Sequence, residues 1–461
     1  MSEFRIEKDS MGEMKVPADA YYASQTQRAV ENFPISGITI GRSMIKALGT
    51  IKRSAADTNL ELGLLKPELH RVIVAAAEEV ESGKLDIHFP IDVFQTGSGT
   101  SSNMNANEVI AFRARELSKG ELQVHPNDHV NMSQSSNDVI PTAIHIAAAS
   151  AISSQLIPAL TELKAALDVK VKDFALIVKT GRTHLMDATP ITLGQEFSGY
   201  ASQVGHSLGR AKIALKELLE LPLGGTAVGT GVNTPQGFSA RVIEKLAKTT
   251  GLAFFEAENH FEAQAAKDSL VQASGCLKTI AVSFSKIGND LRWLGSGPRC
   301  GIGELLLPEV QPGSSIMPAK VNPVIIESLL MVVAQVIGND ATICFGGSVG
   351  SSFELNVMMP VMAHNLLQSI ELLSTTAINF SRKCIVDIKA NEKRIAELAE
   401  ANISVVTSLA PKIGYDQAAK LAKEAYETGE SLREIAERKK VLPKADLDRI
   451  LDLLSMTKPG L

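Results

Sequence analysis

Apolar residues recur at helical spacing through most of the chain. Between residues 193 and 218 they follow one another in steps of three and four, which places them on one face of a helix. A second series alternates the same steps without error: Leu277, Ile280, Phe284, Ile287, Leu291 and Leu294. This alternation is typical of a coiled-coil-like seam. We expect the second helix to run from about residue 257 to 294, a length of roughly 57 Å at 1.5 Å per residue.

Two further stretches, 324–337 and 361–378, are apolar on nearly every side. Neighbouring helices must therefore surround them. Helices this long cannot bury their whole length in one small domain, so we expect a bundle that continues into partner subunits. Shorter helical patterns occur at about 42–62 and 67–83. The predicted fold class is mainly α, with a central long-helix bundle and few, peripheral strands.

Changes in composition divide the chain into three predicted domains. With 461 residues it exceeds what one hydrophobic core usually serves. We expect an N-terminal, mostly helical domain over 1–138 and the long-helix bundle over 139–390. The segment 391–461 is charged and has short amphipathic pieces, which predicts a small helical C-terminal domain.

Composition excludes several classes of protein. Hydrophobic residues at 45% and charged residues at 21% are typical of a soluble globular protein, and the net charge of −5 argues against a nucleic-acid surface. The N-terminus has neither a signal core nor an Arg-rich presequence, and no run of 18 or more apolar residues suggests a membrane span. A cytoplasmic location without a membrane partner is expected. Four widely spaced cysteines give no support to a disulfide framework or an iron–sulfur cluster.

A polar loop interrupts the apolar helices at 311–323, Gln-Pro-Gly-Ser-Ser-Ile-Met-Pro-Ala-Lys-Val-Asn-Pro. Pro and Gly punctuate loops, and a loop this polar within a helical protein needs a reason. Its hydroxyl, ammonium and amide groups could hold and deprotonate an anionic substrate; they belong to Ser314, Ser315, Lys320 and Asn322. Composition alone leaves an ordinary interhelical connection equally open.

The run Gly313-Ser-Ser-Ile-Met-Pro-x-Lys-x-Asn-Pro resembles the signature of the fumarase/aspartase superfamily, and the likeness extends to about residue 390. Within that superfamily the chain is most similar to class II fumarases. The resemblance implies reversible hydration of the dicarboxylate fumarate to (S)-malate, as in the tricarboxylic acid cycle. It also implies a homotetramer with a common helical core, sites shared between subunits, and no cofactor or metal. An isolated chain would then be inactive.

The resemblance also assigns catalytic roles. Ser314 matches the base that takes the carbon-bound proton, which a serine can do only if positive charge, here from Lys320, stabilises its alkoxide. His184 matches a histidine that works with a water and a glutamate, here Glu327, which would orient its tautomer and raise its basicity. Taken singly, a serine or a histidine is more often structural, and the complete motif reverses that expectation. Amino-eliminating relatives usually carry Gln where His184 stands, so aspartate ammonia-lyase is the alternative activity.

Two other polar loops match substrate contacts of the family. One is the loop 95–107, which could also be a flexible linker or an anion nest at a helix start. The other is Ser135-Ser136-Asn137, for which helix N-capping is the alternative role. The substrate-binding residues implied are Ser98, Gly99, Thr100, Ser135, Ser136, Asn137, Thr183, Ser315, Lys320 and Asn322.

A further cluster at 125–129 matches a second, noncatalytic anion site of class II fumarases, formed here by His125, Asn127 and Asp128. Leu122 stands where the family often has an Arg, which would weaken or alter that site. The same cluster invites a metal site, but Pro126 opposes a regular helix with both histidines on one face. The glycine-rich run 223–231 fails GxGxxG spacing, so a dinucleotide fold is rejected; it matches a family glycine loop and could equally be a plain turn.

Two more distant functions complete the alternatives. A structural protein descended from the superfamily is one, and intact Ser314, Lys320 and His184 argue against it. An iron–sulfur hydratase is the other, and the cysteine spacing argues against it.

Overall fold

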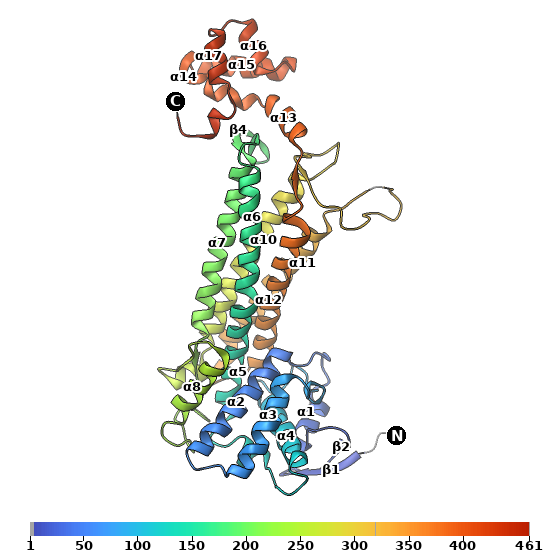
Figure 1. Cartoon of the computed structure of the whole chain (residues 1–461), viewed down its shortest axis with the longest axis vertical. Helices are drawn as coiled ribbons and strands as arrows, with labels where there is room; N and C mark the ends of the chain where they lie inside the picture. The colour runs from blue at the N-terminus through green and yellow to red at the C-terminus, as the bar shows by residue number, and fades with distance from the viewer. Residues whose placement is uncertain (1–3, 319, 461) are drawn as a thin grey trace. The chain divides into compact units, whose positions relative to one another are not determined.

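The structure is a computed structural model that describes residues 4–318 and 320–460. Helices dominate, and the long ones run alongside one another (Figure 1). The described strands pair only two at a time, in five small sheets. The prediction of a mainly α fold with few strands is therefore confirmed.

Residue contacts group the chain into two compact units, each described separately. Unit 1 consists of residues 1–158, 209–281 and 332–374. Unit 2 consists of residues 159–208, 282–331 and 375–461. The long helices contribute residues to both: α6 (Ile157–Asp173), α7 (Leu193–Glu217), α10 (Asp268–Leu294), α11 (Val324–Val349) and α12 (Met359–Phe380). The three-domain division stays a prediction.

Unit 1 contains the shorter helices of the first 265 residues. They are α1 (Ser24–Asn32), α2 (Arg42–Glu61), α3 (Pro67–Ser82), α4 (Thr100–Leu117), α5 (Ser136–Ala151), α8 (Phe238–Thr250) and α9 (His260–Ala265). Its strands are the hairpin β1 (Phe4–Asp9) and β2 (Gly12–Pro17), and the short β5 (Glu220–Leu221), β6 (Phe255–Glu256), β8 (Ser351–Ser352) and β9 (Leu355–Asn356). The bounds of α2 and α3 confirm the two predicted helical patterns. Pro67 begins α3 where a missing N–H does no harm, and left-handed Gly83 ends it.

Unit 2 contains a β-hairpin, the polar loop 311–323, which we call the signature loop, and the C-terminal helices. Its strands are β3 (Val178–Thr183), β4 (Met186–Thr192), β7 (Leu305–Leu306) and β10 (Lys389–Ala390). The helices are α13 (Glu392–Glu400), α14 (Ala410–Ile413), α15 (Tyr415–Thr428), α16 (Leu432–Arg438) and α17 (Lys444–Ile450). Short amphipathic helices need a shared core, and α14 to α17 surround one apolar cluster that includes Leu421, Ile435 and Leu447.

The predicted seam is buried along its whole length, because all six of its residues are at most 5% exposed. The predicted start of that helix is wrong, since α9 ends at Ala265 and α10 begins at Asp268. Ala266 is extended, and the Lys267 Nζ donates to the carbonyls of Ala263, Gln264 and Ala266, which ends α9. The 27 residues of α10 span about 40 Å.

Two helical segments are long and apolar enough to cross a bilayer by length and composition alone, which the sequence pattern did not indicate. In Ser136–Asp173, 67% of the most apolar window is buried within the protein, as in the core helix of a soluble protein. In Val324–Val349 only 33% is buried. The second helix therefore has an apolar side that its own chain leaves open.

A buried ion network fixes the hairpin β3–β4 in unit 2. Glu304 is fully buried, and the Arg182 guanidinium donates to both of its oxygens at 3.1 and 2.9 Å. The Lys179 Nζ, which is 1% exposed, lies 3.2 Å from Glu304 and 3.2 Å from Glu196. The Glu304 carbonyl accepts from the backbone N–H of Asn391. The Glu304 carboxylate thus joins the hairpin to the segment that carries β7, and its backbone carbonyl connects that segment to the start of α13.

Replacing Glu304 tests this network. Glu304→Gln leaves Arg182 without its buried counter-charge and Lys179 with Glu196 alone, so we expect the free energy of unfolding to fall by about 3 kcal/mol. Urea denaturation measures the change. The matched control is Glu309→Gln, an exposed position in the same segment, which should stay within about 0.5 kcal/mol of the parent. Equal stability of the two variants would contradict the role of the network.

Acid should destabilise unit 1 through His145, whose Nδ1 lies 2.7 Å from the Glu220 carbonyl oxygen and whose Nε2 lies 3.0 Å from Ser269 Oγ. Burial, with a smaller contribution from Lys267, lowers the pKa of His145 to about 4. The unfolded chain binds a proton near pH 6.5, so stability should fall by about 3 kcal/mol as pH drops from 6.5 to 4. His145→Gln should lose that part of the pH dependence, measured by denaturation at each pH. The exposed-site control His206→Gln should keep it, and an identical slope in both variants would refute the assignment.

Candidate functional site

The predicted site residues fall into two sets. Ser98, Gly99, Thr100 and the segments 125–128 and 135–137 belong to unit 1. Thr183, His184, the loop 311–323 and Glu327 belong to unit 2. Each set is built by its own local structure.

The loop before α4 presents two adjacent hydroxyl groups. Ser98 Oγ and Thr100 Oγ1 lie 2.8 Å apart, at the N-terminus of an 18-residue helix. Gly99 between them has a φ of 75°, and a Cβ there would lie 2.8 Å from Ile140. The Gln95 Oε1 accepts from the Ser102 backbone N–H at 3.0 Å and fixes the loop. Hydroxyls at a helix N-terminus suit an anion, so the rigid nest, rather than a flexible linker, describes this loop.

The start of α5 combines capping with a possible anion contact. Ser135 and Asp138 form a capping box, which confirms the N-cap role for Ser135. The Asn137 side chain donates to the Ala227 carbonyl at 2.8 Å, and Asn103 of α4 donates to Ser136 Oγ at 3.3 Å. Asn103 thereby connects the start of α5 to α4, the helix that begins at Thr100.

The glycine-rich run 223–231 packs next to this helix start. One Asp138 oxygen accepts the backbone N–H groups of Gly224 and Thr226, both at 3.0 Å. A Cβ on Gly225 would lie 2.0 Å from Gln264 Oε1, so no larger residue fits there without displacing that side chain. Burial raises the pKa of Asp138, and its backbone N–H donors act in the opposite direction. The run is therefore a fixed part of the site's surroundings in unit 1.

The predicted second anion site forms a single π-helical turn, Pro126–Val130, capped by His125. His125 Nδ1 accepts from the Asp128 backbone N–H at 3.1 Å and lies 3.3 Å from the Asp128 carboxylate. His129 accepts from the His125 backbone N–H, and burial lowers the pKa of His129. In the described part of the chain, no three His, Cys, Asp or Glu side chains gather in a way that could hold a metal ion.

Thr183 and His184 lie at the tip of the hairpin β3–β4, which the sequence did not predict. His184 and Leu185 have φ values of 58° and 62°, as required at both central positions of a two-residue type I′ turn. Leu185 is 71% exposed, and His184 is exposed beside it. Among the described residues, none forms a hydrogen bond or ion pair with the His184 side chain. The His184 imidazole at the tip is therefore exposed and has no hydrogen bond or ion pair to the described residues of its own chain.

The signature loop holds its first serine in a particular way. Ser314 Oγ accepts the backbone N–H groups of Ile316 at 3.2 Å and Met317 at 3.0 Å. The loop closes through the Gly313 N–H, which donates to the Lys320 carbonyl at 2.8 Å. The Asn322 side chain donates to the Gly313 carbonyl at 2.7 Å, so one of its two amide hydrogens is already used.

The groups around this serine are open to solvent. Ser315 and Lys320 are exposed, and so is Glu327 in the first turn of α11. Within the described residues no hydrogen bond or ion pair links His184 to Glu327 or to the loop 311–323. One chain thus presents these catalytic candidates on its surface without bringing them together by direct contact.

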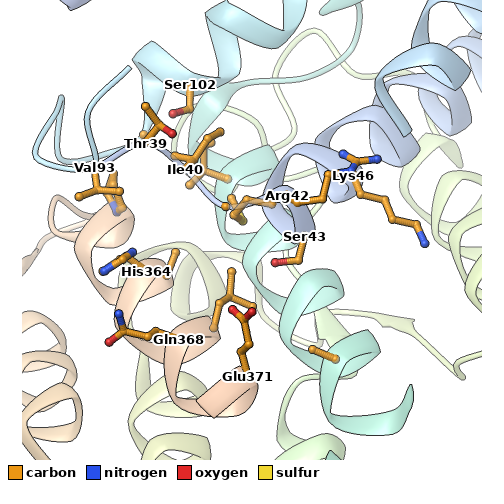
Figure 2. Close-up of a pocket in the computed structure, with 18 of the residues that line it drawn as sticks. Thr39, Ile40, Arg42, Ser43, Lys46, Val93, Ser102, His364, Gln368 and Glu371 are labelled. Carbon is orange, nitrogen blue, oxygen red and sulfur yellow. The ribbon is translucent and has the colours of Figure 1, made fainter. Parts of the chain in front are cut away.

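A cavity of about 470 Å³ lies in unit 1, between the start of α2 and one side of α12. Figure 2 shows His364, Gln368 and Glu371 on α12 across from Ser43 on α2. Gly99 and Ser102 border this cavity, whereas the hydroxyls of Ser98 and Thr100 and the residues 135–137 do not line it. Of the predicted substrate contacts in unit 1, Gly99 alone lines this cavity among the described residues.

The chain matches known families over most of its length. The lyase family matches residues 12–338, and the fumarase C C-terminus matches residues 405–458. The class II fumarate hydratase of Mycobacterium tuberculosis is 54% identical over 462 residues, covering 99% of this chain and 97% of its own. The mitochondrial fumarate hydratase of Saccharomyces cerevisiae is 54% identical over 452 residues, covering 97% and 92%.

A solved structure agrees with these relatives. The class II fumarase of Schistosoma mansoni superimposes with a TM-score of 0.96 at 40% identity, covering 100% of both chains. The prediction of a fumarate hydratase, rather than an aspartate ammonia-lyase, is confirmed. Full-length identity above 50% to relatives of one activity leads to one assignment: the chain belongs to the lyase family, among its class II fumarate hydratases.

Proposed function

We propose that Ser314 is the base that takes the carbon-bound proton in this fumarate hydratase. The observation that carries the proposal is the pair of backbone N–H groups, from Ile316 and Met317, that donate to Ser314 Oγ. Two such donors stabilise negative charge on oxygen before any substrate arrives. Lys320, in the same loop, adds positive charge. The two N–H donors and the Lys320 charge together stabilise the alkoxide, which makes Ser314 a more effective base than an ordinary serine.

In the dehydrating direction, the Ser314 alkoxide removes the proton from C3 of malate. The electron pair of that bond moves into the adjacent carboxylate, which becomes a doubly charged aci-carboxylate while the other carboxylate keeps its single charge. The intermediate collapses to fumarate as the C2 hydroxyl leaves, protonated through a water by His184. Glu327 orients the imidazole, and hydration follows the reverse path. No metal ion takes part in this mechanism.

The carboxylates of the substrate meet the remaining polar groups. Hydroxyl, amide and ammonium donors come from Ser98, Gly99, Thr100, Ser135, Ser136, Asn137, Thr183, Ser315, Lys320 and Asn322. Ser135 caps α5 with its side chain, so its part in binding is to hold the N–H groups of that helix start toward the anion. The His125, Asn127 and Asp128 turn serves as a second anion site, weakened by Leu122.

The active unit is a homotetramer in which different subunits complete each site. Support comes from the open side of α11, where Met331, Phe345 and Val349 are 69, 58 and 60% exposed. Exposed small residues continue the same face in steps of three and four: Ala334, Gly338 and Ala341. This pattern is a helix seam without a partner in its own chain.

Protein rather than lipid covers this seam. Elsewhere on α11, buried Asp340 accepts from Ser274 Oγ at 2.7 Å and Lys278 Nζ at 2.6 Å, a charged contact unsuited to a bilayer. We place the enzyme in the cytoplasm, with a role in the tricarboxylic acid cycle.

Substrate turnover tests the catalytic assignment. The parent protein should convert malate to fumarate, followed by ultraviolet absorbance, and should leave aspartate unchanged. Ser314→Ala and His184→Gln should each lower kcat by roughly 10²–10⁴-fold, because each removes a proton-transfer group. Ser82→Ala, an exposed serine in α3, is the control and should retain full activity. Turnover of aspartate alone would contradict the hydratase, and inactivity on every dicarboxylate would favour a structural protein.

Assembly tests the shared site. Phe345→Asp places a charge in the open seam of α11, so the tetramer should dissociate, as measured by sedimentation, and activity should be lost. Tyr415→Asp, at an 81% exposed aromatic residue of α15, should leave the tetramer intact. The two single variants, Ser314→Ala and His184→Gln, can also be mixed, unfolded and refolded together. This mixture should regain part of the activity, because mixed tetramers contain some complete sites. Absence of any recovery in assembled mixtures would exclude sites shared in this way.

A further inference from the structure

A buried lysine lies behind the start of α5 in unit 1. Lys52 of α2 is 0% exposed, and its Nζ donates to Asn131 Oδ1 at 2.9 Å and to Gln134 Oε1 at 3.0 Å. Burying an ammonium group costs several kcal/mol unless its environment compensates. An apolar side chain would fill the same space in α2 without that cost. The lysine therefore has a task beyond filling the core.

Asn131 gathers the contacts around this lysine. Its Oδ1 also accepts the side-chain N–H groups of Asn103 and Asn107 of α4, both at 3.2 Å. Its own amide donates to the Gln134 carbonyl at 3.1 Å. Three helical donors from α2 and α4 thus converge on one oxygen at the start of the short segment that leads into α5.

The same contacts reach a predicted substrate-binding side chain. Asn103 donates both to Asn131 and to Ser136 Oγ, the latter at 3.3 Å. Ser136 is only two residues beyond Gln134, and Asn137 follows it. Movement of Asn131 would therefore be transmitted to both of these residues.

Asp138 is the charged group that acts on Lys52 from α5. Its carboxylate accepts the backbone N–H groups of Ser135, Gly224 and Thr226, so these backbone contacts, independent of the lysine, fix it. Burial lowers the pKa of Lys52 to about 7, and the charge of Asp138 opposes that shift. Either protonation state of the amine retains the two hydrogen atoms that its two contacts need.

A second buried lysine shows what a purely structural role looks like. Lys267 is 1% exposed, and its Nζ donates to three backbone carbonyls at the end of α9. Lys52 instead contacts the side chains of the segment that precedes Ser136 and Asn137. The two lysines are matched in burial and differ in what they hold.

We propose that Lys52 is a positioning residue for the substrate carboxylate, acting through Asn131 and Asn103 on Ser136 and Asn137. The proposal rests on the substrate-binding roles given to those two residues under the proposed function. Without Lys52, Asn131 loses its charged donor and the segment 131–137 can relax. Substrate and transition state then lose the same contact, which raises KM and leaves kcat nearly unchanged.

The test compares Lys52→Met with Lys267→Met in the assembled enzyme. Both variants should lower the melting temperature. We expect Lys52→Met to raise KM for fumarate by about tenfold with kcat changed by less than about threefold, and Lys267→Met to keep KM within about twofold. An unchanged KM in Lys52→Met, or the same rise in both variants, would overturn the proposal.

Asn103→Ala provides a second route if Lys52→Met does not fold. It interrupts the connection between Asn131 and Ser136 while Lys52 and Asn131 remain paired, so KM should again rise. An unchanged KM in folded Asn103→Ala overturns the proposal by itself. Ser136→Ala reports on the underlying function: a raised KM supports it, and an unchanged KM refutes the assignment of Ser136 and the inference that depends on it.

Discussion

The exposed apolar seam of α11 is the constraint on which the proposed enzyme depends. A large apolar side chain left in water forgoes roughly 1.5–3 kcal/mol of burial energy, and Met331, Phe345 and Val349 share one face of this helix. Buried Asp340, elsewhere on the same helix, finds its polar partners Ser274 and Lys278 within the chain. Other chains that cover this face, as in the tetramer that we propose, would recover this energy, and assembly would then be coupled to catalysis.

Buried charges fix the segments behind the site in both units. In unit 2, the Glu304 carboxylate binds Arg182 and Lys179 of the His184 hairpin, and the Glu304 backbone carbonyl accepts from Asn391 before α13. In unit 1, Asp138 joins the start of α5 to the glycine-rich run. Such groups are costly to bury alone, and each has enough donors to be satisfied. The segments that these buried charges fix thus support the side chains to which we give catalytic and binding roles.

Helical periodicity predicted the long helices well, because a buried face repeats every three to four residues whatever the neighbouring sequence is. The seam from Leu277 to Leu294 is an example. Periodicity could not locate the break at Ala266, since the interruption depends on Lys267 folding back on three carbonyls. The His184 hairpin was also missed, because its turn lacks the Asn-Gly pair that marks a type I′ turn in sequence.

Motif likeness identified the family and the candidate side chains, whereas their surroundings required coordinates. The two N–H donors to Ser314 Oγ belong to residues two and three positions further along the chain, a contact that serine favours in turns, but only coordinates show that this loop makes it. The sequence around Lys52 in α2 likewise does not indicate which side chains bind its amine. Asn103 and Asn107 lie on α4 and Asn131 lies in the segment before α5, and only the packing of these elements around α2 brings them together at Lys52.

The isolated position of His184 at a hairpin tip has a consequence for inheritance. In the proposed tetramer, a faulty copy contributes its defective tip to a neighbour's site and its loop to another. In an equal mixture of normal and defective chains, half of the sites would receive a defective tip, so about half of the activity would be lost and the inactive sites would be distributed over mixed oligomers. If sites are shared in this way, a newly synthesised chain would be catalytically inactive until it assembles with other chains.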